Sequence, residues 1–256
     1  MKIVDAFWER RNLGVACVEV TIETTDTEAE VKNGLARLAT QYLVVKVPAG
    51  RSDLMFCLSE MGCSFIEASI HITRKLAHLE LSGIQKRLAD SVSYAPMQES
   101  DMQVLWNELR NGMYDTDRIC LDPHFTKEQA AGRYIGWIQD EVARGADVYK
   151  LVYRNQSIGY FTLKSLGDGV YYPFLAGMYQ SHRNSGLGFN AAYKPMCEIR
   201  ARGGTSVSTY ISTNNGRAVR LHATMGFRFD EIAYVYIKHF DAGGSASGKQ
   251  GRAACF

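Results

Sequence analysis

A short glycine-containing stretch, Arg183-Asn-Ser-Gly186-Leu-Gly188, carries the residues best suited to chemistry. It follows a predicted strand and opens a predicted helix, whose first backbone N–H groups have no acceptor inside the helix. Glycine lets the chain turn tightly and approach a ligand, the helix dipole attracts an anion, and Arg183 adds a positive charge. The stretch therefore predicts a pyrophosphate cradle made of backbone N–H groups from residues 183–188.

Two other interpretations of this stretch are open. Gly186-x-Gly188-x-x-Ala191 also matches a dinucleotide-binding fingerprint, which requires an acidic residue at the end of the following strand to hold a ribose. The predicted strand 206–212 is instead followed by Thr213-Asn-Asn, which disfavours a dinucleotide. The second alternative is a glycine turn with only a structural role.

A second segment, after the next predicted strand, reads Asn215-Gly-Arg-Ala218-Val-Arg-Leu221-His222-Ala-Thr-Met-Gly-Phe227. Taken with Arg183-x-x-Gly-x-Gly188, it resembles the GCN5-related N-acetyltransferases, whose pattern here is Asn-x-x-Ala-x-x-Leu-Tyr-x-x-x-Gly-Phe. Every fixed position agrees except His222. The resemblance covers about residues 92–240 and implies an α/β (α+β) fold with a mixed, largely antiparallel central sheet flanked by helices.

The resemblance implies that the chain binds acetyl-CoA (coenzyme A) and transfers an acyl group to a primary amine, such as that of a nucleotide-linked amino sugar. A backbone amide near Met178 would polarise the thioester carbonyl, and His222 would replace a tyrosine that protonates the leaving thiolate. Arg118 would bind the diphosphate of such an acceptor. The residues implied for the cofactor are Met178, Tyr179, Arg183, Asn184, Ser185, Gly186, Leu187, Gly188, Asn215 and Ala218.

His222 is the departure from the family pattern. An ordinary histidine has a pKa of about 6.5, against about 10 for tyrosine, so a protonated ring could donate to the thiolate while much of it lacks that proton at neutral pH. A histidine packed against the last helix is the alternative. If His222 marks lost catalysis, the chain is an acyl-CoA-binding module; another small amine or a protein N-terminus are alternative acceptors. The general base is not assigned.

The elements around these segments predict three parts. Residues 1–92 form a small N-terminal α/β domain, residues 93–240 the acetyltransferase domain, and the Gly/Ser-rich residues 241–256 a disordered tail. Such a two-domain order resembles the dTDP-fucosamine acetyltransferases. A faint internal echo, Leu58-Ser-Glu-Met-Gly against His222-Ala-Thr-Met-Gly, suggests that the first domain is a degenerate half of the second.

Some local expectations can be checked directly. Residues 171–179 are predicted to form one strand, and Asn155-Gln156 to join two strands in a hairpin. A helix is predicted over residues 188–203, with Pro195 bending or breaking it.

Composition excludes several classes. The chain has 256 residues, 46% hydrophobic and 22% charged, with a formal net charge of +2, so no strong field recruits nucleic acid or a membrane. No apolar run is long enough for a membrane helix, and the N-terminus lacks the apolar core of a signal peptide. We expect a cytoplasmic protein without a metal site, and a homodimer is a possible assembly.

Overall fold

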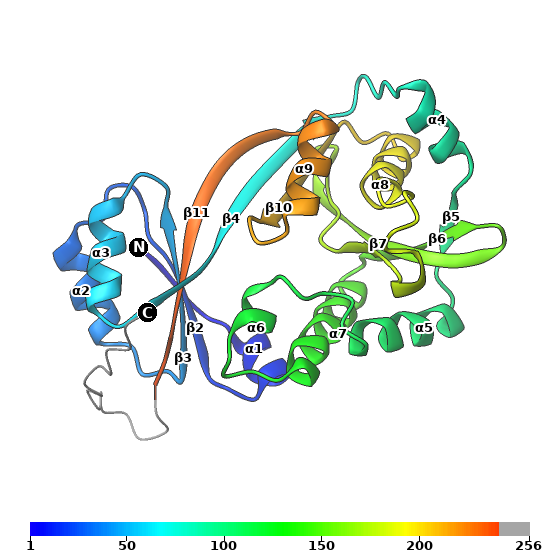
Figure 1. Cartoon of the computed structure of the whole chain (residues 1–256). Coiled ribbons are helices and arrows are strands. Elements are labelled where there is room, and N and C mark those ends of the chain that lie inside the picture. The colour runs from blue at the N-terminus through cyan, green and yellow to red at the C-terminus, as the bar shows by residue number, and fades with distance from the viewer. Residues whose placement is uncertain (241–256) are drawn as a thin grey trace, which may run out of the picture. The chain divides into compact units, whose positions relative to one another are not determined.

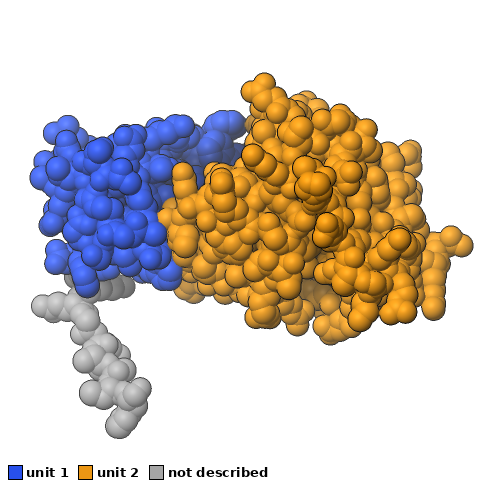
Figure 2. All heavy atoms as spheres, turned by 90° about the horizontal axis from the view of Figure 1, so that it is seen from above, with its two compact units in different colours: residues 1–65, 234–256 blue, residues 66–233 orange. Residues whose placement is uncertain are grey.

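The computed structural model describes residues 1–240, which form two compact units (Figure 2). Unit 1 comprises Met1–Phe65 with residues 234–240, and unit 2 comprises Ile66–Ala233. Two long strands, β4 (Ser64–Lys75) and β11 (Arg228–His239), have residues in both units. The division predicted at residue 92 stays a prediction, and the predicted tail lies outside the described residues.

Unit 1 is a small α/β layer. Strand β1 is antiparallel to β2, β2 is parallel to β3, and the last residues of β11 follow β3 in the strand order. The apolar side chains of β2, β3 and two helices form one core, which includes Val31 and Leu54. The bounds are β1 (Lys2–Asp5), α1 (Phe7–Leu13), β2 (Cys17–Thr21), α2 (Glu28–Ala36), β3 (Tyr42–Pro48) and α3 (Ser52–Glu60).

Unit 2 contains the larger sheet, with strand order β4-β10-β8-β7-β6-β5 and β9 paired to β7. Strand β8 is parallel to β10, whereas β4 with β10, β5 with β6, and β7 with each of β6, β8 and β9 pair antiparallel. The predicted mixed, largely antiparallel sheet flanked by helices is therefore confirmed. The strands are β5 (Ser93–Pro96), β6 (Asp147–Tyr153), β7 (Gln156–Gly167), β8 (Val170–Tyr172), β9 (Ala176–Met178) and β10 (Ser206–Ser212).

Helices cover both faces of this sheet, α8 and α9 on one and α5 and α7 on the other (Figure 1). Because successive side chains of a strand point to opposite faces, Phe161 joins the core under α8, while its neighbour Tyr160 joins the core under α5 and α7. The helices are α4 (Gly83–Asp90), α5 (Glu99–Arg110), α6 (Arg118–Leu121), α7 (Lys127–Ala143), the short 3-10 helix η1 (Gln180–His182), α8 (Asn190–Ala201) and α9 (Gly216–Thr224). Among the helices of residues 1–240, none combines the length and apolar content needed to cross a bilayer.

The strand predicted over residues 171–179 is wrong in one respect, because it is broken into β8 and β9. The break falls at Pro173, which has no N–H for a ladder. Opposite it, the buried Thr162 hydroxyl accepts from the Leu175 N–H and donates to the Leu175 carbonyl, both at 2.9 Å. A side chain thus replaces part of the backbone pairing, which the residue pattern alone did not reveal.

Two other local predictions also need correction. Helix α8 is continuous through Pro195, which is buried among residues such as Met196 and Ile199 that hold the helix on the sheet. The hairpin turn consists of Arg154 and Asn155, with φ of 48° and 62°, which is one residue earlier than predicted. Positive φ at both central residues is typical of a two-residue type I′ turn.

The internal echo extends to the elements around it. Helices α3 and α9 have nine residues each and have Met61 and Met225 as their C-cap residues. Gly62 and Gly226 follow, with φ of 77° and 71°. The strands that follow, β4 and β11, have twelve residues each. These equal lengths agree with a duplication, which stays a prediction.

Candidate functional site

Strands β8/β9 and β10 part inside unit 2. The parallel ladder between β8 and β10 has only two residue pairs, Ser206 with Val170 and Val207 with Tyr171. The Thr209 hydroxyl donates to the Pro173 carbonyl at 2.9 Å just beyond them. From there, β9 pairs with β7 alone, so one backbone edge of β9 has no neighbouring strand among residues 1–240.

The register of β9 shows which residues direct their backbone groups to this open edge. The Thr162 N–H donates to Leu175 and the Tyr179 N–H to Ile158, at 2.8 and 2.9 Å. Backbone groups of alternate residues face the partner strand in an antiparallel pair. Ala176 and Met178 must therefore direct their N–H and C=O groups away from β7, and the Met178 groups have no hydrogen-bond partner within the described chain.

The loop 183–188 lies between η1 and α8. The Ser185 hydroxyl donates to the His182 carbonyl at 2.7 Å and accepts from the Leu187 N–H at 3.3 Å, so this side chain shapes the loop. Four other backbone N–H groups find no acceptor within residues 1–240, those of Asn184, Gly186, Gly188 and Phe189. They are the groups that an anion at this corner would need.

Two residues set the path of this loop. Gly186 has φ of +78°, a left-handed conformation that favours glycine, and a Cβ there would have nothing within 4 Å. Asn190, fully buried at the start of α8, donates from Nδ2 to the Leu187 carbonyl at 3.0 Å. The glycine was predicted from the sequence, whereas Asn190 was not.

Arg183 does not extend freely from the loop. Its guanidinium donates to the carbonyls of Met113 and, at 3.4 Å, Gly112, and lies 3.6 Å from the Asp115 carboxylate. The predicted phosphate contact of Arg183 stays a prediction, and its charge already has partners in the segment between α5 and α6.

Three further predicted cofactor residues have structural partners. Tyr179 is buried, and its N–H donates to the Ile158 carbonyl of β7. Burial raises the pKa of its phenol to about 12. Asn215 caps α9, because its Oδ1 accepts from the Ala218 N–H at 3.0 Å. Their contacts with a cofactor stay predictions, and Met178 offers more open backbone groups than Tyr179.

His222 lies in the last turns of α9. Its Nδ1 is 2.8 Å from the Ala218 carbonyl, which can only accept, so Nδ1 carries the hydrogen and Nε2 has the lone pair in the neutral ring. Burial lowers the pKa of His222 below its usual 6.5, against the opposing effect of the Ala218 hydrogen bond. The ring also packs edge-on against Phe227, with 4.8 Å between the two ring centroids. The predicted acid role needs an imidazolium, which burial disfavours.

Arg118 begins α6, a four-residue helix capped by Asp117, whose Oδ1 accepts from the N–H groups of Ile119 and Cys120 at 2.6 and 3.1 Å. The same inter-helix segment, residues 111–117, contacts Arg183. Arg118 therefore directly follows the segment that contacts the loop 183–188. Its contact with a substrate diphosphate stays a prediction.

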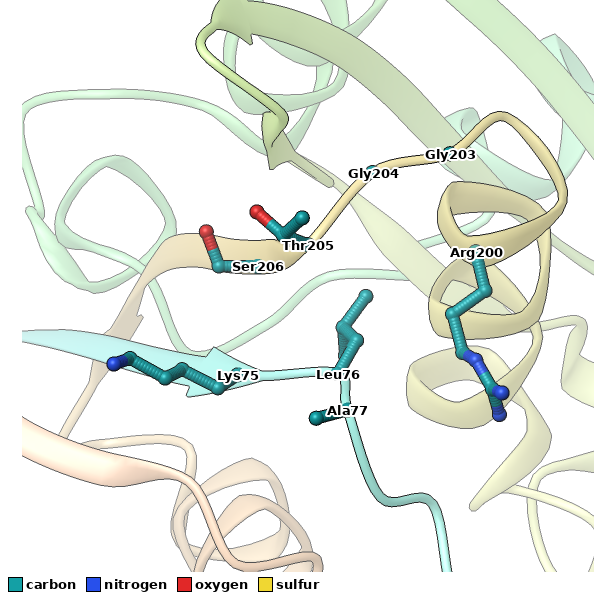
Figure 3. Close-up of a pocket in the computed structure, with 8 residues that line it drawn as sticks. All are labelled: Lys75, Leu76, Ala77, Arg200, Gly203, Gly204, Thr205 and Ser206. Carbon is teal, nitrogen blue, oxygen red and sulfur yellow. The ribbon is translucent and has the colours of Figure 1, made fainter.

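A cavity of about 500 Å³ lies elsewhere in unit 2, between the end of β4, the end of α8 and the start of β10. Its two cations, Lys75 and Arg200, extend in different directions (Figure 3). None of the predicted site residues lines it: its lining is Lys75, Leu76, Ala77, Arg200, Gly203, Gly204, Thr205 and Ser206.

No family model matches the sequence, and no curated protein matches it closely. Solved structures do match. A GCN5-related N-acetyltransferase from Sphaerobacter thermophilus aligns at 10% identity over 93% of this chain and 75% of its own, with a TM-score of 0.59. One from Kribbella flavida aligns at 16% identity over 90% and 82%, with a TM-score of 0.52. The chain has the GCN5-related N-acetyltransferase fold.

A functionally unknown conserved protein from Staphylococcus epidermidis also aligns, at 12% identity over 88% of this chain and 84% of that one, with a TM-score of 0.56. Identities this low concern the fold alone. The predicted resemblance in fold is confirmed, and the narrower likeness to dTDP-fucosamine acetyltransferases stays a prediction.

Several residues shape the site although the sequence patterns predicted no role for them. A Cβ on Gly159 would lie 2.4 Å from the Gly177 carbonyl oxygen, and one on Gly177 would lie 2.6 Å from Met113 Cε. The Gln180 N–H donates to Glu108 at 2.9 Å. The register of β7 with β9 brings Gly159 close to Gly177, and the packing of α5 and the segment after it brings Glu108 and Met113 to the same place. No local motif could therefore have identified these residues.

Proposed function

We propose that this chain is an acyl-CoA-dependent N-acyltransferase, which transfers an acetyl group from acetyl-CoA to a primary amine. The observation that carries the proposal is the set of N–H groups without an acceptor in the described chain, those of Asn184, Gly186, Gly188 and Phe189. In the sequence they follow the open amide of Met178 and the short helix η1. The fold and both sequence segments agree with this activity.

The residues present suit a pyrophosphate followed by an extended thioester arm. Hydrogen bonds from N–H groups to an ionised phosphate are roughly twice as strong as neutral ones, and the start of α8 adds its dipole. Gly188 leaves room above the loop, because a Cβ there would meet only Met178 Cγ, at 3.9 Å. The open edge of β9 offers the Met178 N–H and C=O to an extended arm in the manner of an added strand.

Acetyl-CoA would supply a thioester, whose acyl group is activated towards an amine, and coenzyme A would leave as the thiol. The Met178 N–H would donate to the thioester oxygen and stabilise the negative charge that develops there. Holding both reactants in line converts a bimolecular reaction into an effectively intramolecular one. His222, neutral at pH 7, would accept a hydrogen bond at Nε2, and it becomes an acid only after gaining a proton.

For the acceptor, we propose the amine of a nucleotide-linked amino sugar, with Arg118 near its diphosphate. This finer proposal rests on the sequence resemblance and on the position of Arg118 at the start of α6. The alternative acceptors are another small amine and a protein N-terminus. The alternative function is an acyl-CoA-binding module without turnover.

Calorimetric titration of the full chain with acetyl-CoA tests the central claim, and thiol release with an amine panel tests turnover. We expect binding, and release with at least one amine. Binding without release would favour the non-catalytic module. A chain that binds a nicotinamide dinucleotide and not coenzyme A would refute the proposal.

A further inference from the structure

Arg183 connects the loop 183–188 to residues 111–117, the segment between α5 and α6. Its guanidinium donates to the Met113 carbonyl and to the Gly112 carbonyl, and Asp115 lies 3.6 Å away. A guanidinium presents five donors in a fixed planar arrangement, so two carbonyls and a carboxylate occupy much of that capacity. Arg183 is therefore placed to hold residues 111–117.

The same segment is fastened to the open edge of β9. Tyr114 Oη is 3.1 Å from the Ala176 carbonyl, which can only accept, so Tyr114 donates to it. The hydroxyl of Tyr160, 2.6 Å from Tyr114 Oη, must then donate to Tyr114. This chain of hydrogen bonds ends on an outward-facing carbonyl of β9.

Packing reinforces these bonds. The Met113 side chain is 5% exposed and takes up the room that a Cβ on Gly177 would need. Burial raises the pKa of both Tyr114 and Tyr160 well above 10, so the two hydroxyls keep their hydrogens throughout the working pH range. The carbonyl of Ala176 is thereby occupied, while the Met178 groups next to it stay open.

We propose that Arg183 is a positioning residue for the acceptor side of the site, because it holds residues 111–117 against the outer edge of β9. This inference rests on the proposed function. An amine that reaches a thioester at Met178 must pass the segment that borders β9, so the placement of this segment controls access. The pyrophosphate is then held mainly by backbone N–H groups, and the charge of Arg183 contributes little to its affinity.

Hydrogen–deuterium exchange of residues 111–117 and the Kd for coenzyme A, each measured on the full chain, test this proposal. For Arg183→Gln we expect faster exchange of the segment and a coenzyme A Kd within fivefold of wild type. Asp115→Asn should give the same pattern more weakly, and Arg183→Lys should recover part of the protection. Arg200→Gln, at an exposed arginine of α8, the helix that follows the loop, is the control and should change neither quantity.

A functional readout separates positioning from simple structure. With acetyl-CoA saturating, Arg183→Gln should raise the KM of the best amine in a panel of glucosamine, spermidine and a peptide at least fivefold, while kcat falls less. A coenzyme A Kd raised more than fivefold, or unchanged exchange at residues 111–117, would overturn the proposal. Wild-type protein that binds no coenzyme A would instead refute the proposed function. The exchange measurement would still report whether Arg183 holds residues 111–117.

Discussion

The two units each contain a parallel strand–helix–strand segment, and the two segments differ in how far their strands pair. In unit 1, β2 and β3 pair over five residues, from Cys17 with Tyr42 to Thr21 with Lys46. In unit 2, β8 and β10 pair over two residues and then part, and β9 turns to β7. One segment is closed along its length, and the other presents an open backbone edge.

The corners that lead into the two helices differ in the same direction. Before α2, the Glu23 N–H donates to Asp26 at 2.7 Å, and Thr27 and Glu30 form a reciprocal capping box. The corner is acidic, and Asp26 also holds the amino group of Met1 at 2.8 Å. Before α8, four N–H groups have no acceptor in the described chain.

This comparison teaches that a strand–helix corner is not by itself an anion site. Every α-helix begins with N–H groups that lack internal partners. In unit 1, side chains accept from the N–H groups of Thr27 and Glu30 and add negative charge. In unit 2, four N–H groups of the corner stay open, two of them those of glycines. The side chains of the corner therefore decide between a capped helix start and one whose N–H groups are open to an anion.

Making the second corner acidic like the first should have the largest effect. For Gly186→Glu we expect the acetyl-CoA Kd to rise at least about 100-fold, because a carboxylate opposes the phosphates and a side chain strains the left-handed backbone. Calorimetry measures it. Gly203→Glu is the matched control, since Gly203 has φ of +77° and an equally open environment after α8. Equal losses in both variants would show that strain, and not charge at the corner, is responsible.

Closing the approach of β7 to β9 should have the next largest effect. Gly159→Ala places a Cβ 2.4 Å from a backbone oxygen, which cannot move without β9, and overpacking typically costs about 1–3 kcal/mol. We expect roughly tenfold lower turnover, an order-of-magnitude figure for displacing the Met178 amide. In Gly177→Ala the one tight contact is with the end of the flexible Met113 side chain, at 2.6 Å, while the Tyr114 hydroxyl lies at an ordinary 3.5 Å. This variant should therefore be milder in both melting temperature and turnover. The opposite ranking would contradict this account.

His222→Phe should lower turnover at saturating substrates by roughly tenfold, below the usual range for a positioned acid or base because burial disfavours the charged ring. The acetyl-CoA Kd should change little, which distinguishes loss of chemistry from loss of binding. Steady-state kinetics and calorimetry on the same preparations provide the test. Turnover equal to wild type would leave His222 as a packing residue.

The corner of unit 1 should matter for stability alone. Thr27→Ala removes the side chain that caps α2 and should cost about 1 kcal/mol of unfolding free energy. Urea denaturation measures the loss. The acetyl-CoA Kd should be unchanged, and a weakened Kd would mean that the two corners are not functionally distinct.

The smallest effect concerns pH. Leu58 of α3 takes the place that His222 has in α9 when the two Met-Gly turns are aligned, so His222→Leu introduces the unit 1 residue. Because burial lowers the folded pKa of His222, the unfolded chain binds more protons below pH 6.5. The stability contributed by neutral His222 is present above about pH 6.5 and is lost as pH falls towards the lowered pKa. The leucine variant should show a shallower loss of unfolding free energy between neutral pH and pH 5, and identical slopes would contradict this.

Much of the fold could be predicted from local patterns. The predicted strand over residues 206–212 agrees with β10. The sequence pattern Thr126-x-x-Gln129 is typical of a capping box, and it forms one at the start of α7. The helices α1 and α4 were not predicted; α1 buries few residues, and the mean hydropathy of α4 is low. Such short elements depend on their neighbours, because isolated helices of this length are marginal in water.

The sequence by itself determined where the backbone can turn and which helix begins with open N–H groups, since glycines and their spacing act locally. Tertiary structure alone decided that β9 pairs with β7 and not with β10, that Arg183 reaches Met113 and Asp115, and that burial lowers the pKa of His222. Those features depend on strand register and on the exclusion of water. Both arise from residues far apart in the chain, so no local pattern encodes them.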